Sequence, residues 1–214
     1  MSTQIFEDNR WSTTPQKNEF RHGMALELTP EGSVLDVGCG DGLLLQMLAQ
    51  KGIQAQGVDI SDVAVKECNK KGFTVQKNDF TTDLLPFEKG SFDTVIALDV
   101  LEHVYNPEKL LSEMNRVSKS NIVISVPNFG SLPARVQVLL GRVPENNRPN
   151  KGHLYWFTWS VLKDLLAQEH LLIEERRFNT VWERVPILGL VTKKIAQISP
   201  SLFALSFVIR CKKT

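Results

Sequence analysis

The sequence predicts an α/β fold built on a doubly wound and mostly parallel β-sheet. Strand-like and helix-like segments alternate five times along residues 33–127, the pattern of a parallel sheet with right-handed crossovers. A glycine-rich turn, GCGDG at 38–42, joins the first of these strands to a helix. Acidic residues stand at the carboxyl ends of four strands, at Asp36, Asp59, Asp79 and the segment Asp99–His103. Because parallel strands end at one edge of a sheet, and ligands bind there, these residues predict one shared site.

Size and composition indicate one domain over residues 1–214. The chain has a formal net charge of +1, with 42% hydrophobic and 23% charged residues, which is ordinary for a folded protein. The near-neutral charge gives no electrostatic support for a nucleic-acid partner. The three cysteines are far apart and form no C-x-x-C pair, which favours reduced thiols and a cytoplasmic location. No apolar run reaches about 18 residues and no signal peptide is recognisable, so we expect no membrane span.

The turn at 38–42 has the form of a ligand cradle. The segment Val34–Val37 predicts a buried strand before it, and the apolar run Leu43–Ala49 predicts a helix after it. Glycine has no Cβ, so a ligand can touch the backbone of this turn. Asp59, which lies 23 residues after Asp36, ends the next predicted strand, where a carboxylate can accept both ribose hydroxyls of an adenosine ligand. The alternative role for Asp59 is to cap the next helix, for which Ser61 is better placed.

The remaining segments continue this alternation and then depart from it. Further strands are predicted over Ile53–Asp59, Phe73–Gln76, Phe92–Leu98, Asn121–Val126, Leu171–Phe178 and Leu205–Cys211. Further helices are predicted over Asn18–Leu28 and Ser61–Lys71, after the start signal Asn106-Pro107-Glu108, and from Thr158 or Ser160 onward. Residues 186–203 are expected to be irregular and partly helical.

Two segments are predicted to cover the ligand edge of the sheet. Residues 1–32 are expected to form an N-terminal helical cap, with the helix at 18–28 lying over the pocket. Its possible pocket residues are Arg10, Trp11, Arg21 and His22. Residues 127–157 hold several prolines and glycines and a Tyr-Trp-Phe cluster. Long irregular insertions in compact domains are usually functional, so we expect this insertion to bind an acceptor substrate.

Five motifs carry a resemblance to a known superfamily. In chain order they are VLDVGCGDG, GVDIS, NDF, SFDTVIALDVLEHV and HLYWFT. With these motifs in this order, residues 18–212 resemble the class I S-adenosylmethionine (SAM) methyltransferases. Within that superfamily, PNFGSLPARVQVLLGRVPENN resembles the MetW family of methionine biosynthesis, and LEHV resembles quinone-biosynthesis O-methyltransferases. The resemblance implies a Rossmann-like sheet of seven strands, with an antiparallel last strand and helices on both faces. It also implies SAM as cofactor and S-adenosylhomocysteine (SAH) as product.

The resemblance further implies a role for each site residue. The methionine end of SAM is assigned to Asp36, Gly38, Cys39, Gly40 and Gly42, the ribose to Asp59, and the adenine to Asp79 and Phe80. Ile60, Asp99 and Val100 complete the cofactor site. The methyl group passes to a small-molecule acceptor, with a hydroxyl oxygen as the preferred target. His103 is the leading candidate for the base because imidazole titrates near neutral pH, and His153 is the second. A structural role is the alternative for both histidines.

Other interpretations of the same residues stay open. Asp99, Glu102 and His103 could together hold Mg²⁺ or a similar ion, although we expect no metal. A non-enzymatic alternative is a MetW-like, SAM-binding partner of a biosynthetic enzyme such as homoserine O-acetyltransferase. Tyr105 and Lys109 match the Y-x-x-x-K spacing of short-chain oxidoreductases, but Pro107 between them and the glycine spacing argue against that class.

A last alternative concerns the C-terminal part of the chain. Leu188, Val191, Ile195 and Ile198 form an apolar stripe at helical spacing. We expect this stripe to face the core; the alternative is a peripheral membrane contact.

Overall fold

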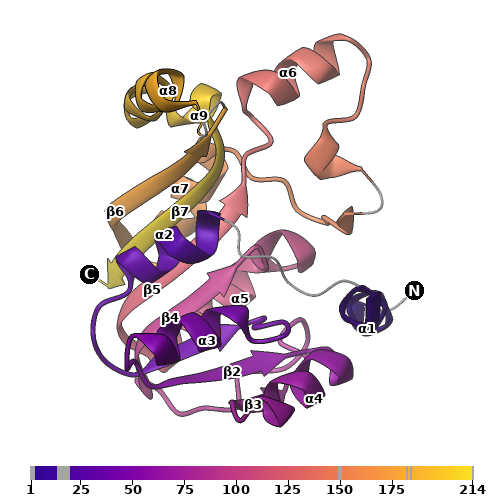
Figure 1. The fold of residues 1–214 in the computed structure, drawn as a ribbon, viewed down its shortest axis with the longest axis vertical. Helices are drawn as coiled ribbons and strands as arrows, with labels where there is room; N and C mark the ends of the chain where they lie inside the picture. Colours follow the sequence, from indigo (N-terminus) through magenta and orange to yellow (C-terminus); the bar gives the residue numbers. More distant parts are fainter. Residues whose placement is uncertain (1–2, 14–19, 149–150, 182, 184, 214) are drawn as a thin grey trace.

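Seven strands form one sheet in the part of the chain that the computed structural model describes, which is residues 3–13, 20–148, 151–181, 183 and 185–213. The strands are β1 (Val34–Val37), β2 (Ala55–Asp59), β3 (Thr74–Lys77), β4 (Phe92–Leu98), β5 (Ser118–Pro127), β6 (Leu171–Thr180) and β7 (Ala204–Lys213). Their order is β3-β2-β1-β4-β5-β7-β6 (Figure 1). Strands β1 to β5 run parallel, and β7 pairs antiparallel with both β5 and β6. The predicted fold class is confirmed.

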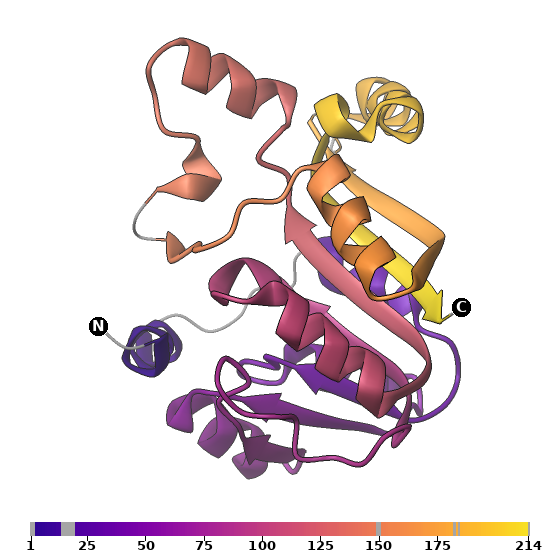
Figure 2. The same cartoon turned by 180° about the vertical axis from the view of Figure 1, so that it is seen from behind.

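Helices cover both faces of this sheet, as Figures 1 and 2 show from opposite sides. The helices of the sheet region are α2 (Phe20–Leu28), α3 (Leu43–Gln50), α4 (Asp62–Lys70), α5 (Pro107–Val117) and α7 (Trp159–Gln168). On β4, Val95 and Ala97 pack into the core cluster that includes α5 and α7, whereas Ile96 packs with α2 and α3. This alternation is the two-residue period of a strand buried on both faces.

The N-terminal region differs from the prediction. Residues 1–17 show no apolar periodicity, yet α1 (Thr3–Thr13) is a helix that packs against α4. The prediction that the helix at 18–28 lies over the ligand pocket is wrong for most of α2. Ala25 and Leu28 are buried against β5 and β7, so α2 covers a sheet face, and α1 covers the ligand edge instead. Residues 14–19, which include the start of the predicted helix, lie outside the described residues.

The insertion and the C-terminal link are more regular than predicted. The insertion holds α6 (Leu132–Leu139) and the 3₁₀ turn η2 (Glu145–Asn147), and the link forms α8 (Pro186–Ile198) and α9 (Pro200–Phe203). The expectation that the apolar stripe of α8 faces the core is wrong. Leu188, Val191 and Ile198 are 47%, 45% and 86% exposed, while α8 buries its small residues Gly189 and Ala196. No helix in the described ranges has the length and hydropathy needed to cross a bilayer.

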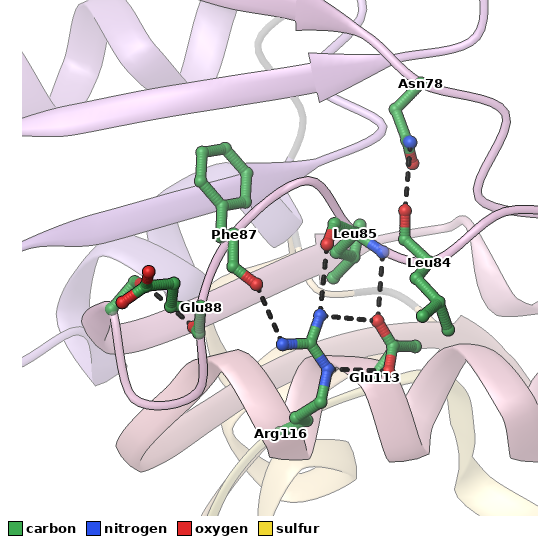
Figure 3. Close-up of polar contacts among 8 residues, drawn as sticks. Asn78, Leu84, Leu85, Phe87, Glu88, Glu113 and Arg116 are labelled. Atoms are coloured by element: carbon green, nitrogen blue, oxygen red, sulfur yellow. Dashed lines mark hydrogen bonds and ion pairs between the residues drawn. The ribbon is translucent and has the colours of Figure 1, made fainter.

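A polar network fixes the long loop between β3 and β4 (Figure 3). Arg116 on α5 donates to the carbonyls of Leu85 and Phe87 at 3.0 and 2.8 Å, and its guanidinium forms a fork with Glu113. Glu113 in turn accepts from the Leu85 amide at 2.9 Å. Since charged hydrogen bonds are among the strongest in proteins, this network holds the loop against α5. The loop carries Phe80, whose position matters for the site.

Candidate active site

The glycine-rich turn is shaped by contacts that only glycine permits. Gly38, Gly40 and Gly42 all have positive φ, at 73°, 55° and 86°. The amide of Gly38 donates to the Val58 carbonyl at 2.8 Å, which ties the turn to β2. A Cβ at Gly38 would lie 2.5 Å from Cγ2 of Val100. The turn therefore brings backbone, not side chains, to the carboxyl edge of the sheet.

Asp59 is held beneath this turn by two backbone amides. Its carboxylate accepts from Gly40 N and from Ser61 N, each at 2.8 Å. Ser61, not Asp59, caps α4 by accepting from the Ala64 amide, as expected. Burial raises the pKa of Asp59 to about 6. Each oxygen keeps a lone pair, so the carboxylate can still accept from a ligand hydroxyl.

Asp36 is buried at the end of β1, close to Asp59. Burial, and then the charge of Asp59, raise the pKa of Asp36 to about 8. Asp36 is thus held in an apolar interior, where a cationic ligand group nearby would stabilise its charged form.

Helix α1 closes the space in front of the turn. The Trp11 ring lies so close to Gly40 that a Cβ there would be 2.6 Å from Cη2. The space that remains is about 60 Å³. The predicted site residues that line it are Gly38, Asp59, Ile60, Phe80, Asp99, Val100 and His103, together with Arg10, Trp11 and Arg21. Asp36, Cys39, Gly40, Gly42 and Asp79 are absent from its lining, and His22 is buried elsewhere.

The residues after β3 divide into a turn and a wall. Asp79 accepts hydrogen bonds from the backbone amide and the hydroxyl of Thr81, so it shapes the turn. Phe80 and Thr81 form the wall. Thr81 was not predicted, because a threonine in a polar loop gives no pattern to recognise.

Asp99 lines both the space in front of the glycine turn and a second cavity. It has φ of +54°, an uncommon conformation for a non-glycine residue, and such strain often occurs at functional sites. Its carboxylate forms an ion pair with Arg21 and accepts from Ser125 Oγ at 2.6 Å. Ser125 on β5 also accepts from the Asp99 amide at 3.0 Å. Arg21 on α2 and Ser125 on β5 therefore fix this turn from two sides.

The second cavity is large and lies against the insertion. Its volume is about 810 Å³, and residues of α6, η2 and the segment 151–153 contribute to its wall. It shares Arg10, Arg21, Asp99 and His103 with the smaller space. The two cavities thus meet at one wall.

Two histidines and one glutamate cluster at that wall. The His103 and His153 ring centroids are 4.9 Å apart, and His153 Nε2 lies 3.9 Å from Oε1 of the fully buried Glu102. Burial, and then His153, lower the pKa of His103 to about 4. Burial also lowers the pKa of His153 and raises that of Glu102 well above its usual range. Both predicted base candidates therefore lie together and are neutral at pH 7.

The space in front of the glycine turn has residues that suit SAM but is too small for it. Positive-φ glycines and the Asp59 carboxylate suit a nucleoside with a short polar chain. Pockets for ligands of this size occupy about 300–1,000 Å³, several times the space that remains beside Trp11. A fit therefore requires α1 to move away from Gly40.

Comparisons with known proteins find relatives of two kinds. The chain is 34% identical over 90 residues to the ubiquinone biosynthesis O-methyltransferase of Methylococcus capsulatus, covering 40% of this chain and 38% of that protein. It is 32% identical over 173 residues to the bifunctional methionine biosynthesis protein MetXA/MetW of Rhodopirellula baltica, covering 72% of this chain and 27% of that protein. The chain thus spans well under half the length of these relatives.

Solved structures share the fold. A SAM-dependent methyltransferase from Archaeoglobus fulgidus superposes with a TM-score of 0.65 at 23% identity, covering 98% of each chain. Magnesium protoporphyrin IX methyltransferase from Synechocystis, with bound SAH, gives 0.65 at 19% identity, covering 100% of this chain and 95% of that one. The fold is that of the SAM-dependent methyltransferases. The family model described as methionine biosynthesis protein MetW matches residues 19–179, so the chain belongs to the MetW family.

Proposed function

We propose that this protein is a SAM-dependent methyltransferase that transfers a methyl group to a small-molecule acceptor, with a hydroxyl oxygen as the attacked atom. The observation that carries the proposal is the shared wall of the two cavities. One cavity has the glycine turn and Asp59 at its base, the other is open to the insertion, and Asp99 and His103 line both. Residues 127–157 would then select the acceptor within a single domain.

Bound SAM supplies an electrophilic methyl group on a positively charged sulfur. The chain's own residues would position it: Asp59 would accept the ribose hydroxyls and Phe80 would pack beside the adenine. Asp36, which is buried behind the glycine turn, would act on the methionine end through its charge. Because the transfer would disperse the charge of the sulfonium rather than create a new charge, orientation by the chain's residues would be their main contribution. Holding two reactants in line can account for about 7–11 kcal/mol of a barrier.

His103 is placed to accept the acceptor's proton. Its Nδ1 lies 3.1 Å from the Gly152 carbonyl, which can only accept, so Nδ1 carries the hydrogen. The Nε2 lone pair is then free to take a proton. A pKa of about 4 keeps the imidazole in this neutral form at pH 7. General-base assistance contributes about 10²–10⁴ in rate, most when the base titrates near the operating pH, so the lowered pKa of His103 places its contribution at the low end of this range.

The proposal is tested by calorimetry with SAM and SAH, followed by a labelled-methyl screen over acceptor pools. We expect both ligands to bind and Asp59→Ala to weaken them at least about 10-fold, since two ribose hydrogen bonds are lost. Asp164→Ala, an exposed carboxylate on α7, is the matched control and should leave binding unchanged. No affinity for either ligand would refute the proposal.

A second function is favoured by the MetW match. A relative in which MetW is joined to MetXA supports a SAM-binding partner of a biosynthetic enzyme such as homoserine O-acetyltransferase, with little methyl transfer of its own. Mixing the purified proteins and measuring complex formation and acyl transfer, with and without SAM, separates the two functions. The partner role predicts a stable complex and a change in acyl transfer; methyltransferase activity alone predicts neither.

A further inference from the structure

The start of helix α6 presents an unused hydroxyl group to the large cavity. Helix α6 follows β5 closely, at the carboxyl edge of the sheet (Figure 2). Three residues at this start, Ser131, Pro133 and Ala134, line the 810 Å³ cavity. Ser131 is 4% exposed, yet its hydroxyl does not cap α6 and has no hydrogen-bond partner among the described residues. A buried polar group without a partner is costly, so this hydroxyl calls for an explanation.

The first backbone amides of α6 are unused as well. The first hydrogen bond of the helix runs from the Arg135 amide to the Ser131 carbonyl at 2.9 Å. Ahead of it, the amides of Leu132 and Ala134 have no acceptor in the part of the chain that the structure describes, and Pro133 has no N–H. The start of a helix carries partial positive charge and binds carboxylates and phosphates. An anionic oxygen could accept from Ser131 and Ala134 together.

Neighbouring contacts hold these donors in place. The Asn128 side chain donates to the Ala204 carbonyl and accepts from the Gly130 amide, both at 2.8 Å. Arg135 donates from Nε to the Gly130 carbonyl at 2.7 Å, which places its positive charge beside the start of α6. Donors that are already fixed cost less free energy to order when a ligand binds. The start of α6 is therefore a prepared site for an anion.

The charges around the cavity favour the same kind of ligand. Its charged lining residues are three cations and two acids, namely Arg10, Arg21, Lys151, Asp99 and Glu145. Both acids already have a cationic partner, because Asp99 pairs with Arg21 and Glu145 pairs with Arg148 at 3.0 Å. Arg10 lies on α1, which must move before SAM enters the donor site in front of the glycine turn. Lys151 belongs to the insertion, so its positive charge does not depend on α1.

We propose that the methyl acceptor carries an anionic group, a carboxylate or a phosphate, besides its hydroxyl, and that Ser131 and the start of α6 bind this group. The idea of an acceptor rests on the proposed methyl transfer, whereas the anion site does not. The same cavity extends to His103 on the wall shared with the donor site, so one molecule can place its anion at α6 and its hydroxyl near His103. A neutral, apolar acceptor would leave the donors of α6 unpaired.

The first test titrates the full-length protein with sodium phosphate and with sodium acetate, at constant ionic strength, and follows the amide signals by NMR. We expect saturable shifts at Leu132 and Ala134, and the anion that binds more tightly identifies the group. Ser131→Ala should weaken that anion at least about threefold, because a hydrogen bond to a charged group is lost. The same change should not lower the melting temperature, since the hydroxyl that it removes has no partner in the fold.

Ser112→Ala, at an exposed serine on α5, is the matched control and should bind the anion as wild type does. Two results overturn the inference. One is the absence of a saturable shift at Leu132 and Ala134 with either anion. The other is equal affinity for the anion in wild type and Ser131→Ala.

The second test passes the acceptor pools of the labelled-methyl screen over an anion-exchange resin at pH 7. We expect the label in molecules from the retained fraction, and label from the unretained fraction alone overturns the proposed acceptor class. SAM calorimetry on the same samples reports separately on the methyl transfer. A protein that binds the anion but neither SAM nor SAH refutes the proposed function and leaves the anion site standing. If neither fraction accepts label, the anion titration decides on the site alone.

Discussion

Asp36 and Asp59 lie buried beneath the glycine turn, and their burial makes the stability of the protein depend on pH. An aspartate titrates near 3.8 in the unfolded chain, but near 8 for Asp36 and 6 for Asp59 in the folded protein. Between these values the folded state holds more protons than the unfolded state. The stability of the fold therefore falls as pH rises. Asp59 causes this loss between about pH 4 and pH 6, and Asp36 causes it between about pH 4 and pH 8.

We predict that Asp36→Asn removes the larger part of this pH dependence. Asparagine does not ionise. From pH 5 to pH 8, the free energy of unfolding should therefore fall by at least about 1.4 kcal/mol less for the variant than for wild type, which is the equivalent of one pKa unit. Urea denaturation at both pH values measures this. Asp164→Asn, at an exposed site, should follow wild type. A variant with the wild-type pH slope would show that Asp36 is ionised in the folded protein.

His103 gives the residue-scale prediction for catalysis. His103→Ala is expected to lower the rate of methyl transfer about 10²-fold, because the Nε2 acceptor is removed and its lowered pKa makes it a weak base. The affinity for SAH should change less than about threefold, because His103 touches only the rim shared by the two cavities. Single-turnover kinetics and calorimetry measure the two quantities. If both His103→Ala and His153→Ala keep wild-type turnover, neither imidazole is the base and orientation alone suffices.

At the scale of elements, the sequence predicts what short-range patterns encode. The seven strands and the βα turn follow from apolar segments, glycines and strand-end acids such as Asp59. Residues 1–32 are predicted to form a helical cap, but the place of α1 within it could not be predicted, because tertiary contacts stabilise this helix: Asp8 accepts from Ser61 Oγ at 2.6 Å, and Trp11 packs on Gly40. The cluster of Glu102 with His153 also escapes sequence reasoning, since the two residues are 51 positions apart and meet only when the insertion folds back.

Helix α1 should act as a cover over the donor site. Because Trp11 fills the space against Gly40, SAM binds only when α1 moves, and the apparent affinity is reduced by the fraction of molecules that are closed. Trp11→Ala is therefore expected to bind SAM about 10-fold more tightly, with faster association in stopped-flow measurements. Ile5→Ala, a half-exposed residue on the same helix, serves as control. Weaker binding by Trp11→Ala would mean that the ring contacts SAM instead.

The loop that carries Phe80 depends on the network drawn in Figure 3. Arg116→Ala removes the donors to Leu85 and Phe87 and leaves Glu113 without its charge partner. We expect the free energy of unfolding to fall by about 1.5–3 kcal/mol, the usual range for hydrogen bonds of charged groups. Urea denaturation measures the loss, and Lys163→Ala on the exposed side of α7 should cause almost none. A loss below about 0.5 kcal/mol would mean that the network contributes little.

On the scale of the whole molecule, the sheet joins the two halves of the site. Core residues of β1, β4 and β5 belong to one continuous cluster with α5 and α7, and β7 adds Phe207 and Ile209 to it. The donor side rests on β1 and β2, and the acceptor side on β5 and the insertion. With the core shared in this way, we predict that the two sides do not unfold separately and that the described residues form a single domain.

Ligand binding at the donor site should therefore stabilise the entire chain. A ligand present at 100 times its dissociation constant adds about 2.7 kcal/mol to the free energy of unfolding. For a chain of this length, that corresponds to a rise in Tm of about 5–10 °C. We expect calorimetry to show one transition that moves as a unit with SAM, and that moves at most about half as far for Asp59→Ala at the same concentration, because a 10-fold loss of affinity leaves about 1.4 kcal/mol of the stabilisation. If the transition splits, or if SAM shifts only part of it, the donor half and the insertion unfold separately, because the core beneath the sheet does not couple them.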